Sequence, residues 1–78
     1  MATKAFILIE TAVGKSRDVV SALQGINGVA SVDVVTGPYD IIAVLEAPDL
    51  NAIGGLVTGH IHVIKGIQRT VTCLSVGG

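Results

Sequence analysis

Two stretches of the chain, 38 residues apart, share one pattern: a helix-like apolar run ends just before a glycine, and a strand-like run follows. The matching residues are Leu23, Ile26, Gly28 and Val29 in the first stretch and Ile61, Ile64, Gly66 and Ile67 in the second. A strand, a crossover helix and a second strand form a β-α-β unit, and two such units make the ferredoxin-like fold. The repeat therefore predicts the order β-α-β-β-α-β in a single domain of residues 1–78.

The spacing of apolar residues places the individual elements. Strands are expected at residues 4–12, 29–36, 40–47 and 67–76, and helices at 15–24 and 50–64. Asp49 is well placed as the N-cap of the second helix. Gly54, Gly55 and Gly59 each cost a helix about 1 kcal/mol relative to alanine, which predicts a strained or mobile helix. Right-handed crossovers place both helices on one face of a four-stranded antiparallel sheet, so the fold class is α+β.

The first strand is apolar in both of its alternating sets, with Phe6 and Leu8 in one and Ile7 and Ile9 in the other. Such a strand is expected to be buried on both faces of the sheet. Half of the 78 residues are hydrophobic and 14% are charged, which is more apolar material than so small a monomer can hide. A second copy that packs sheet to sheet is the expected cover for the face without helices.

Composition excludes several classes of partner. The net charge is −1, the five Lys and Arg residues are scattered, and there is one Phe, one Tyr and no Trp, so direct nucleic-acid binding is not expected. No segment approaches the roughly 20 apolar residues of a membrane span, and the N-terminal apolar run is too short for a signal peptide. A cytoplasmic protein is expected. The single cysteine, Cys73, excludes an intramolecular disulfide and is expected to be a small core residue.

Glycine, proline and aspartate gather in one turn, between the second and third strands. Gly37 permits unusual backbone geometry, Pro38 donates no backbone hydrogen bond, and Asp40 adds a carboxylate at the start of an apolar strand. Asp40 either bonds the backbone and fixes the hairpin, as aspartate often does in turns, or contacts a ligand or interface. Tyr39 either packs against a neighbouring subunit or shields a ligand.

The chain resembles a known family in three places. These are the pattern Ile26-x-Gly28-Val29, the run from Val35 to Ile42 with Thr36-Gly37-Pro38-Tyr39-Asp40 inside it, and the pattern Ile64-x-Gly66-Ile67. Together they resemble the effector-binding half of the Lrp/AsnC transcriptional regulators, which is called the RAM domain. The resemblance extends from about Ala5 to Val76. Because the helix-turn-helix of those regulators is missing before the first strand, the chain resembles the stand-alone RAM proteins.

The resemblance implies an assembly and a ligand. Family members form homodimers through the sheet face and assemble the dimers into rings, often octamers, with an amino acid or related metabolite between dimers. The residues that it implies as effector-binding are Gly37, Pro38, Tyr39, Asp40, Thr70 and Thr72. Asp40 suits the ammonium group of such an effector, and threonine hydroxyls suit its carboxylate. Thr70 and Thr72 are two apart on a strand and so share a face, although threonine is also simply a good strand former.

The function predicted on this basis is a non-enzymatic effector-binding and oligomerisation module in transcriptional regulation, without a cofactor or metal. One alternative is a structural partner that co-assembles with full-length Lrp/AsnC regulators and binds no ligand. A small ferredoxin-like enzyme is disfavoured, because the space between sheet and helices is expected to be filled by apolar residues such as Leu8, Leu23 and Val34. His60 and His62 do not share a helical face and have no third ligand, so they predict no metal site.

Overall fold

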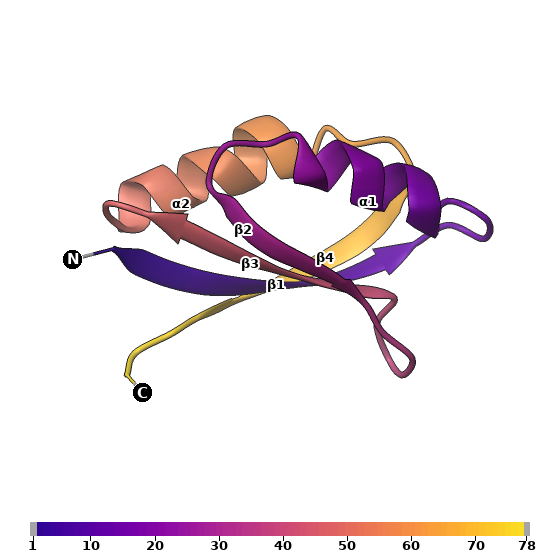
Figure 1. The fold of residues 1–78 in the computed structure, drawn as a ribbon, viewed down its shortest axis with the longest axis horizontal. Helices are drawn as coiled ribbons and strands as arrows, with labels where there is room; N and C mark the ends of the chain where they lie inside the picture. The colour runs from indigo at the N-terminus through magenta and orange to yellow at the C-terminus, as the bar shows by residue number, and fades with distance from the viewer. Residues whose placement is uncertain (1, 78) are drawn as a thin grey trace.

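The computed structural model describes residues 2–77 as one sheet with two helices on one face (Figure 1). The elements are β1 (Thr3–Thr11), α1 (Ser16–Gln24), β2 (Val29–Val34), β3 (Ile41–Ala47), α2 (Leu50–Leu56), a π-helical turn η1 (Val57–Ile61) and β4 (Ile67–Leu74). The sheet order is β2-β3-β1-β4, and the paired strands are antiparallel. The predicted β-α-β-β-α-β order and ferredoxin-like fold are confirmed.

The core lies between the sheet and the helices, and it takes only one of the two apolar sets of β1. Ile7 and Ile9 are fully buried beneath the helices, whereas Phe6 and Leu8 lie half-buried on the opposite face. The fully buried residues of the other elements are Val19, Leu23, Ile41, Ala43, Leu45 and Ile61. The prediction for the space under the helices is therefore correct for Leu23 and wrong for Leu8. It is also wrong for Val34, which is 66% exposed.

A β-bulge changes the alternation of β2. The register shifts between Val29, which pairs with Leu45, and Ser31, which pairs with Val44. Ala30 is the extra residue and is exposed, so it does not share a face with Val32, although simple alternation predicts that it does. Val29 and Val32 both pack against the core. The bulge lets β2 follow the twist of its neighbour at the edge of the sheet.

The two repeated glycines have the same conformation and equivalent positions. Gly28 has φ +100° and Gly66 has φ +101°, which other residues adopt only at a cost. A Cβ at Gly28 would meet Leu56 of α2, and a Cβ at Gly66 would meet Lys15 and Val19 at α1. Each half of the repeat therefore ends with a glycine that lies against the helix of the other half.

The second helix begins as predicted but changes its geometry midway. The Asp49 carboxylate accepts a hydrogen bond of 2.8 Å from the backbone N–H of Ala52, which confirms the N-cap. From Val57 the helix is π-helical, and the His62 N–H donates to the Val57 carbonyl at 2.8 Å. The buried residues Ile53, Val57 and Ile61 are spaced four apart. On an α-helix of 3.6 residues per turn such a row drifts around the axis, and the wider π turn offsets this drift.

Candidate functional site

The backbone of Asp40 ties the predicted effector-binding turn to the sheet. The N–H of Val35 donates to the Asp40 carbonyl at 2.9 Å and closes the loop of residues 36–39. The N–H of Asp40 donates to the carbonyl of Ile9 in β1, also at 2.9 Å. Gly37 has φ +149° and nothing within 4 Å of where a Cβ would lie. Gly37 and Pro38 are exposed, while Tyr39 is half-buried.

The carboxylate of Asp40 is engaged inside the protein. Its Oδ2 accepts hydrogen bonds from the backbone N–H of Thr11 at 2.8 Å and from the Thr11 hydroxyl at 3.3 Å. The Thr11 hydroxyl also lies 2.8 Å from the hydroxyl of Ser16, the first residue of α1. The Thr11 hydroxyl has one proton, and a carboxylate only accepts. When Thr11 donates to Asp40, Ser16 therefore donates to Thr11.

This network answers part of the question that the sequence left open. The Asp40 carboxylate does bond the backbone, but its partner is Thr11 at the end of β1, and only the main-chain carbonyl of Asp40 bonds within the hairpin, to Val35. The sequence reasoning missed Thr11 and Ser16. Their hydroxyls follow an apolar strand and begin a helix, which is the only local signal that could have marked them.

The threonines of the last strand share one face of the sheet, as predicted. Thr70 pairs with Ile9 and Thr72 pairs with Ile7, so both side chains lie on the side of the helices. Thr72 is exposed and Thr70 is half-buried. The Oγ1 of Thr70 lies 3.1 Å from Nε2 of His62, a contact that the sequence reasoning did not predict.

The turn and the two threonines are not brought together within one chain. Ile9 of β1 pairs with Ile41 on one side and with Thr70 on the other, so two strand spacings, about 10 Å, separate the start of β3 from Thr70. No hydrogen bond within residues 2–77 links residues 37–40 to either threonine.

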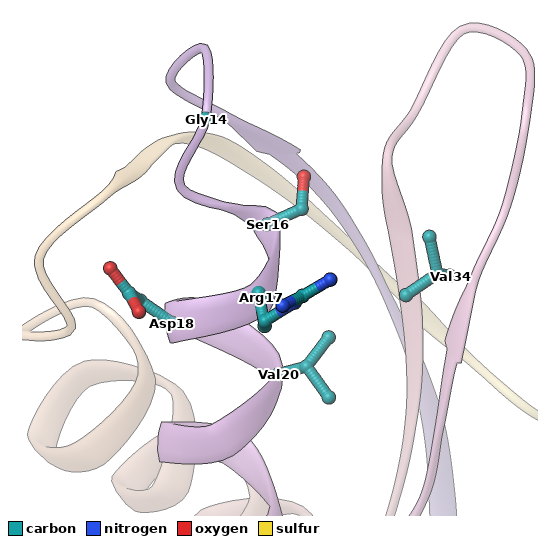
Figure 2. A pocket seen from close by; sticks show the side chains of 6 residues that line it. All are labelled: Gly14, Ser16, Arg17, Asp18, Val20 and Val34. Carbon is teal, nitrogen blue, oxygen red and sulfur yellow. The ribbon is translucent and has the colours of Figure 1, made fainter.

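A shallow depression of about 650 Å³ opens beside the Asp40 network. It is lined by Gly14, Ser16, Arg17, Asp18, Val20 and Val34. Figure 2 shows Ser16, Arg17 and Val20 on the first turns of α1, with Val34 facing them from β2. Ser16 thus belongs both to this depression and to the chain of hydroxyls that ends at Asp40. The sequence reasoning did not single out this surface.

The sheet face away from the helices is largely apolar. Its central side chains are those of Phe6, Leu8, Ile42, Val44, Val71 and Cys73, as the strand register shows. Cys73 is exposed here, so the expectation that it is a core residue is wrong for the single chain. Charges lie at the margin of this face, where Arg69 and Glu10 form an ion pair at 2.6 Å.

The two histidines lie in and just after η1, and His62 contacts Thr70. Within residues 2–77 no group of three or more His, Cys, Asp and Glu side chains is arranged to hold a metal ion. No helix in this part of the chain is long and apolar enough to cross a membrane.

Residues 4–77 match the family model of the Lrp/AsnC ligand binding domain. The chain belongs to this family. It is 31% identical over 78 residues to an uncharacterized HTH-type transcriptional regulator of Pyrococcus furiosus, and the match covers 96% of this chain and 52% of that protein. The chain thus spans about half the length of the curated relatives that it matches.

Solved structures share the fold. A hypothetical protein from Pyrococcus horikoshii superposes with a TM-score of 0.90 at 35% identity, over 100% of this chain and 93% of that one. A transcriptional regulator from Neisseria meningitidis, solved as an L-Met complex, superposes with a TM-score of 0.86 over 96% of this chain and 50% of that one. Because the identity to the Neisseria regulator is 21%, this second likeness shows the fold alone.

Proposed function

We propose that the chain is an effector-binding and oligomerisation module for transcriptional regulation, which binds an amino acid or a related small metabolite where two dimers meet. The observation that carries the proposal is the family match over residues 4–77 to a ligand binding domain of regulators. The L-Met complex of the Neisseria regulator supports an amino acid as the class of effector. The proposed contacts are Gly37, Pro38, Tyr39, Asp40, Thr70 and Thr72.

The separation of these contacts supports a site between copies. The turn and the last strand lie on either side of β1, about two strand spacings apart. A small amino acid that uses Asp40 for its ammonium group and Thr70 or Thr72 for its carboxylate takes the turn from one copy and the strand from another. Effector binding and assembly are therefore coupled in this proposal, since a ligand shared by two copies stabilises their association.

The apolar sheet face supports a dimer as the first step of assembly. Soluble monomers rarely expose a contiguous apolar patch that spans several strands. Leu8, Ile42 and Val71 lie near its centre, and a second copy with the same face buries both patches at once. A two-fold arrangement of this kind is the commonest one among homo-oligomers.

Calorimetry with the twenty common amino acids, together with light scattering of the protein alone and with each of them, tests the proposal. We expect at least one amino acid to bind and to raise the molar mass. Thr72→Val is expected to weaken that binding. Thr58→Val, at an exposed position of η1 where the hydroxyl donates to the Gly54 carbonyl, is expected to leave it unchanged. If no amino acid binds and the molar mass never changes, the effector role is wrong.

The dimer has a test of its own. Ile42→Glu places a charge in the centre of the apolar face and is expected to give monomers, because burying an unpaired carboxylate is strongly unfavourable. Ala22→Glu, which adds the same charge at an exposed position of α1, is the matched control. An Ile42→Glu protein with the molar mass of the wild type would contradict sheet-to-sheet packing.

A further inference from the structure

We propose that Thr11 is a positioning residue of the effector site, which holds one oxygen of the Asp40 carboxylate so that the other is presented to the ammonium group of the effector. This inference rests on the proposed function, and it concerns a residue outside the turn and the last strand. It begins from the hydrogen bonds that converge on Asp40 at the end of β1.

Hydrogen bonds hold both the backbone and the side chain of Asp40. Its N–H donates to Ile9, and its carbonyl accepts from Val35, so its backbone is held on both sides. Its Oδ2 then accepts from both the N–H and the hydroxyl of Thr11. Two donors from one residue on the same oxygen leave the carboxylate little freedom to rotate. Within residues 2–77, Oδ1 has no hydrogen-bond partner.

A carboxylate held in this way suits an ammonium ligand. Charge-assisted hydrogen bonds are about twice as strong as neutral ones, and a fixed acceptor reduces the entropy that binding must overcome. The neutral donors of Thr11 leave the negative charge of Asp40 in place, whereas an internal lysine or arginine would neutralise it. Thr11 thus orients Asp40 without competing for its charge.

Ser16 connects the hydrogen bonds between Thr11 and Asp40 to the first helix. When its hydroxyl donates to Thr11, the Thr11 proton is left for Asp40. Ser16 also lines the depression beside α1 (Figure 2). The orientation of Asp40 is therefore linked to the start of α1 through two hydroxyl groups.

The first part of the test needs no effector. Thr11→Val removes the hydroxyl but keeps the size of the side chain and the backbone N–H, Thr11→Ser restores a hydroxyl, and Thr58→Val is the control. Amide hydrogen exchange, followed by NMR at Thr11, Val35 and Asp40, reports the stability of the turn, because these N–H groups donate to Asp40 Oδ2, the Asp40 carbonyl and the Ile9 carbonyl. We expect exchange about two- to tenfold faster in Thr11→Val, which corresponds to one lost hydrogen bond, and rates near wild type in the other two variants. Unchanged exchange in Thr11→Val overturns the proposal.

The second part measures selectivity, which a merely structural role would not alter. Calorimetry compares L-methionine, or another amino acid that the wild type binds, with the 2-hydroxy acid of the same side chain, which lacks the ammonium group. We expect Thr11→Val to reduce the preference for the amino acid about two- to tenfold and Thr11→Ser to restore it.

The two failures are distinguishable. Equal weakening of both ligands, with an unchanged preference, makes Thr11 only a structural tie and overturns this inference, while the proposed function stands. A wild-type protein that binds no amino acid overturns the proposed function and the effector role of Thr11 together. In that case, faster amide hydrogen exchange in Thr11→Val would still show that the Thr11 hydroxyl stabilises the turn through Asp40.

Discussion

Replacing Gly66 by alanine is expected to destabilise the protein by about 1–5 kcal/mol, and the structure separates the causes. Gly66 has φ +101°, and a left-handed conformation costs a residue with a Cβ about 1–2 kcal/mol. The new Cβ would also lie 2.9 Å from Cβ of Lys15 and 3.1 Å from Cγ2 of Val19, and overpacking of this kind costs about 1–3 kcal/mol. The reduced entropy of the unfolded chain offsets about 0.4–1 kcal/mol.

Two other glycines serve as matched comparisons. Gly14 has φ +78° but nothing within 4 Å of the place that a Cβ would take, so Gly14→Ala carries only the conformational cost. Gly28 has φ +100°, and its nearest neighbour is Cδ1 of Leu56 at 2.7 Å. That contact is shorter than any at Gly66, but the end of a leucine side chain can change rotamer. A valine on a helix is stiff at χ1, and the Cβ of Lys15 moves only with the backbone. The loss of stability is expected to decrease from Gly66→Ala to Gly28→Ala to Gly14→Ala.

Urea unfolding followed by far-UV circular dichroism measures the three variants. All are compared at one protein concentration, because association adds stability that depends on concentration. A loss of 2 kcal/mol corresponds to a decrease in Tm of roughly 8–16 °C for a domain of this size. If Gly66→Ala and Gly14→Ala lose the same stability to within about 0.5 kcal/mol, which is the usual spread of surface substitutions, packing against α1 does not explain why position 66 is glycine.

Three further substitutions test single contacts. Asp40→Ala is expected to lower the free energy of unfolding in urea by about 1–3 kcal/mol, because the N–H of Thr11 loses its acceptor. Asp40→Asn keeps an acceptor, so a smaller loss in Asp40→Ala than in Asp40→Asn would contradict this reasoning. Asp49→Ala removes the cap on the N–H of Ala52 and is expected to cost about 1 kcal/mol, measured as a decrease in Tm, whereas an unchanged Tm would mean that the cap contributes nothing. Gly54→Ala meets nothing within 4 Å and is expected to stabilise the protein by about 1 kcal/mol in the same melting experiment, so a decrease in Tm would show that the helix needs this glycine.

The order of the elements follows from local sequence. The repeat that ends in Gly28 and Gly66 marks two helix-to-strand passages, and the structure has both, with the same positive φ at each glycine. The Asp49 cap is equally local, since it involves a bond between residues three apart. Such features depend only on residues close together in the sequence and on the side-chain periods of helices and strands. They can therefore be predicted from the sequence alone.

The side of the sheet that meets the helices was decided only by the tertiary structure. Both alternating sets of β1 are apolar, so the sequence assigns Ile7 and Leu8 equally well to the core, and the structure buries Ile7 under the helices. The bulge at Ala30 and the π-helical turn after Leu56 also arise from fitting elements to one another. Local propensity carries no signal for such adjustments, because their cause lies in a neighbouring element.

Some features of the candidate site were also readable from the sequence, while others depend on the tertiary structure. The sequence pointed to Gly37–Asp40 and to Thr70 and Thr72, and the shared face of the two threonines follows from their spacing alone. The engagement of Asp40 with Thr11 joins residues 29 positions apart in the chain, and only strand pairing brings these two strand ends together. What the amino-acid sequence determined by itself is that Gly37, Pro38 and Asp40 gather in one turn and that Thr70 and Thr72 share a face. The fold decided which oxygen of Asp40 is held inside, because hydrogen bonds between distant segments exist only once the sheet has formed.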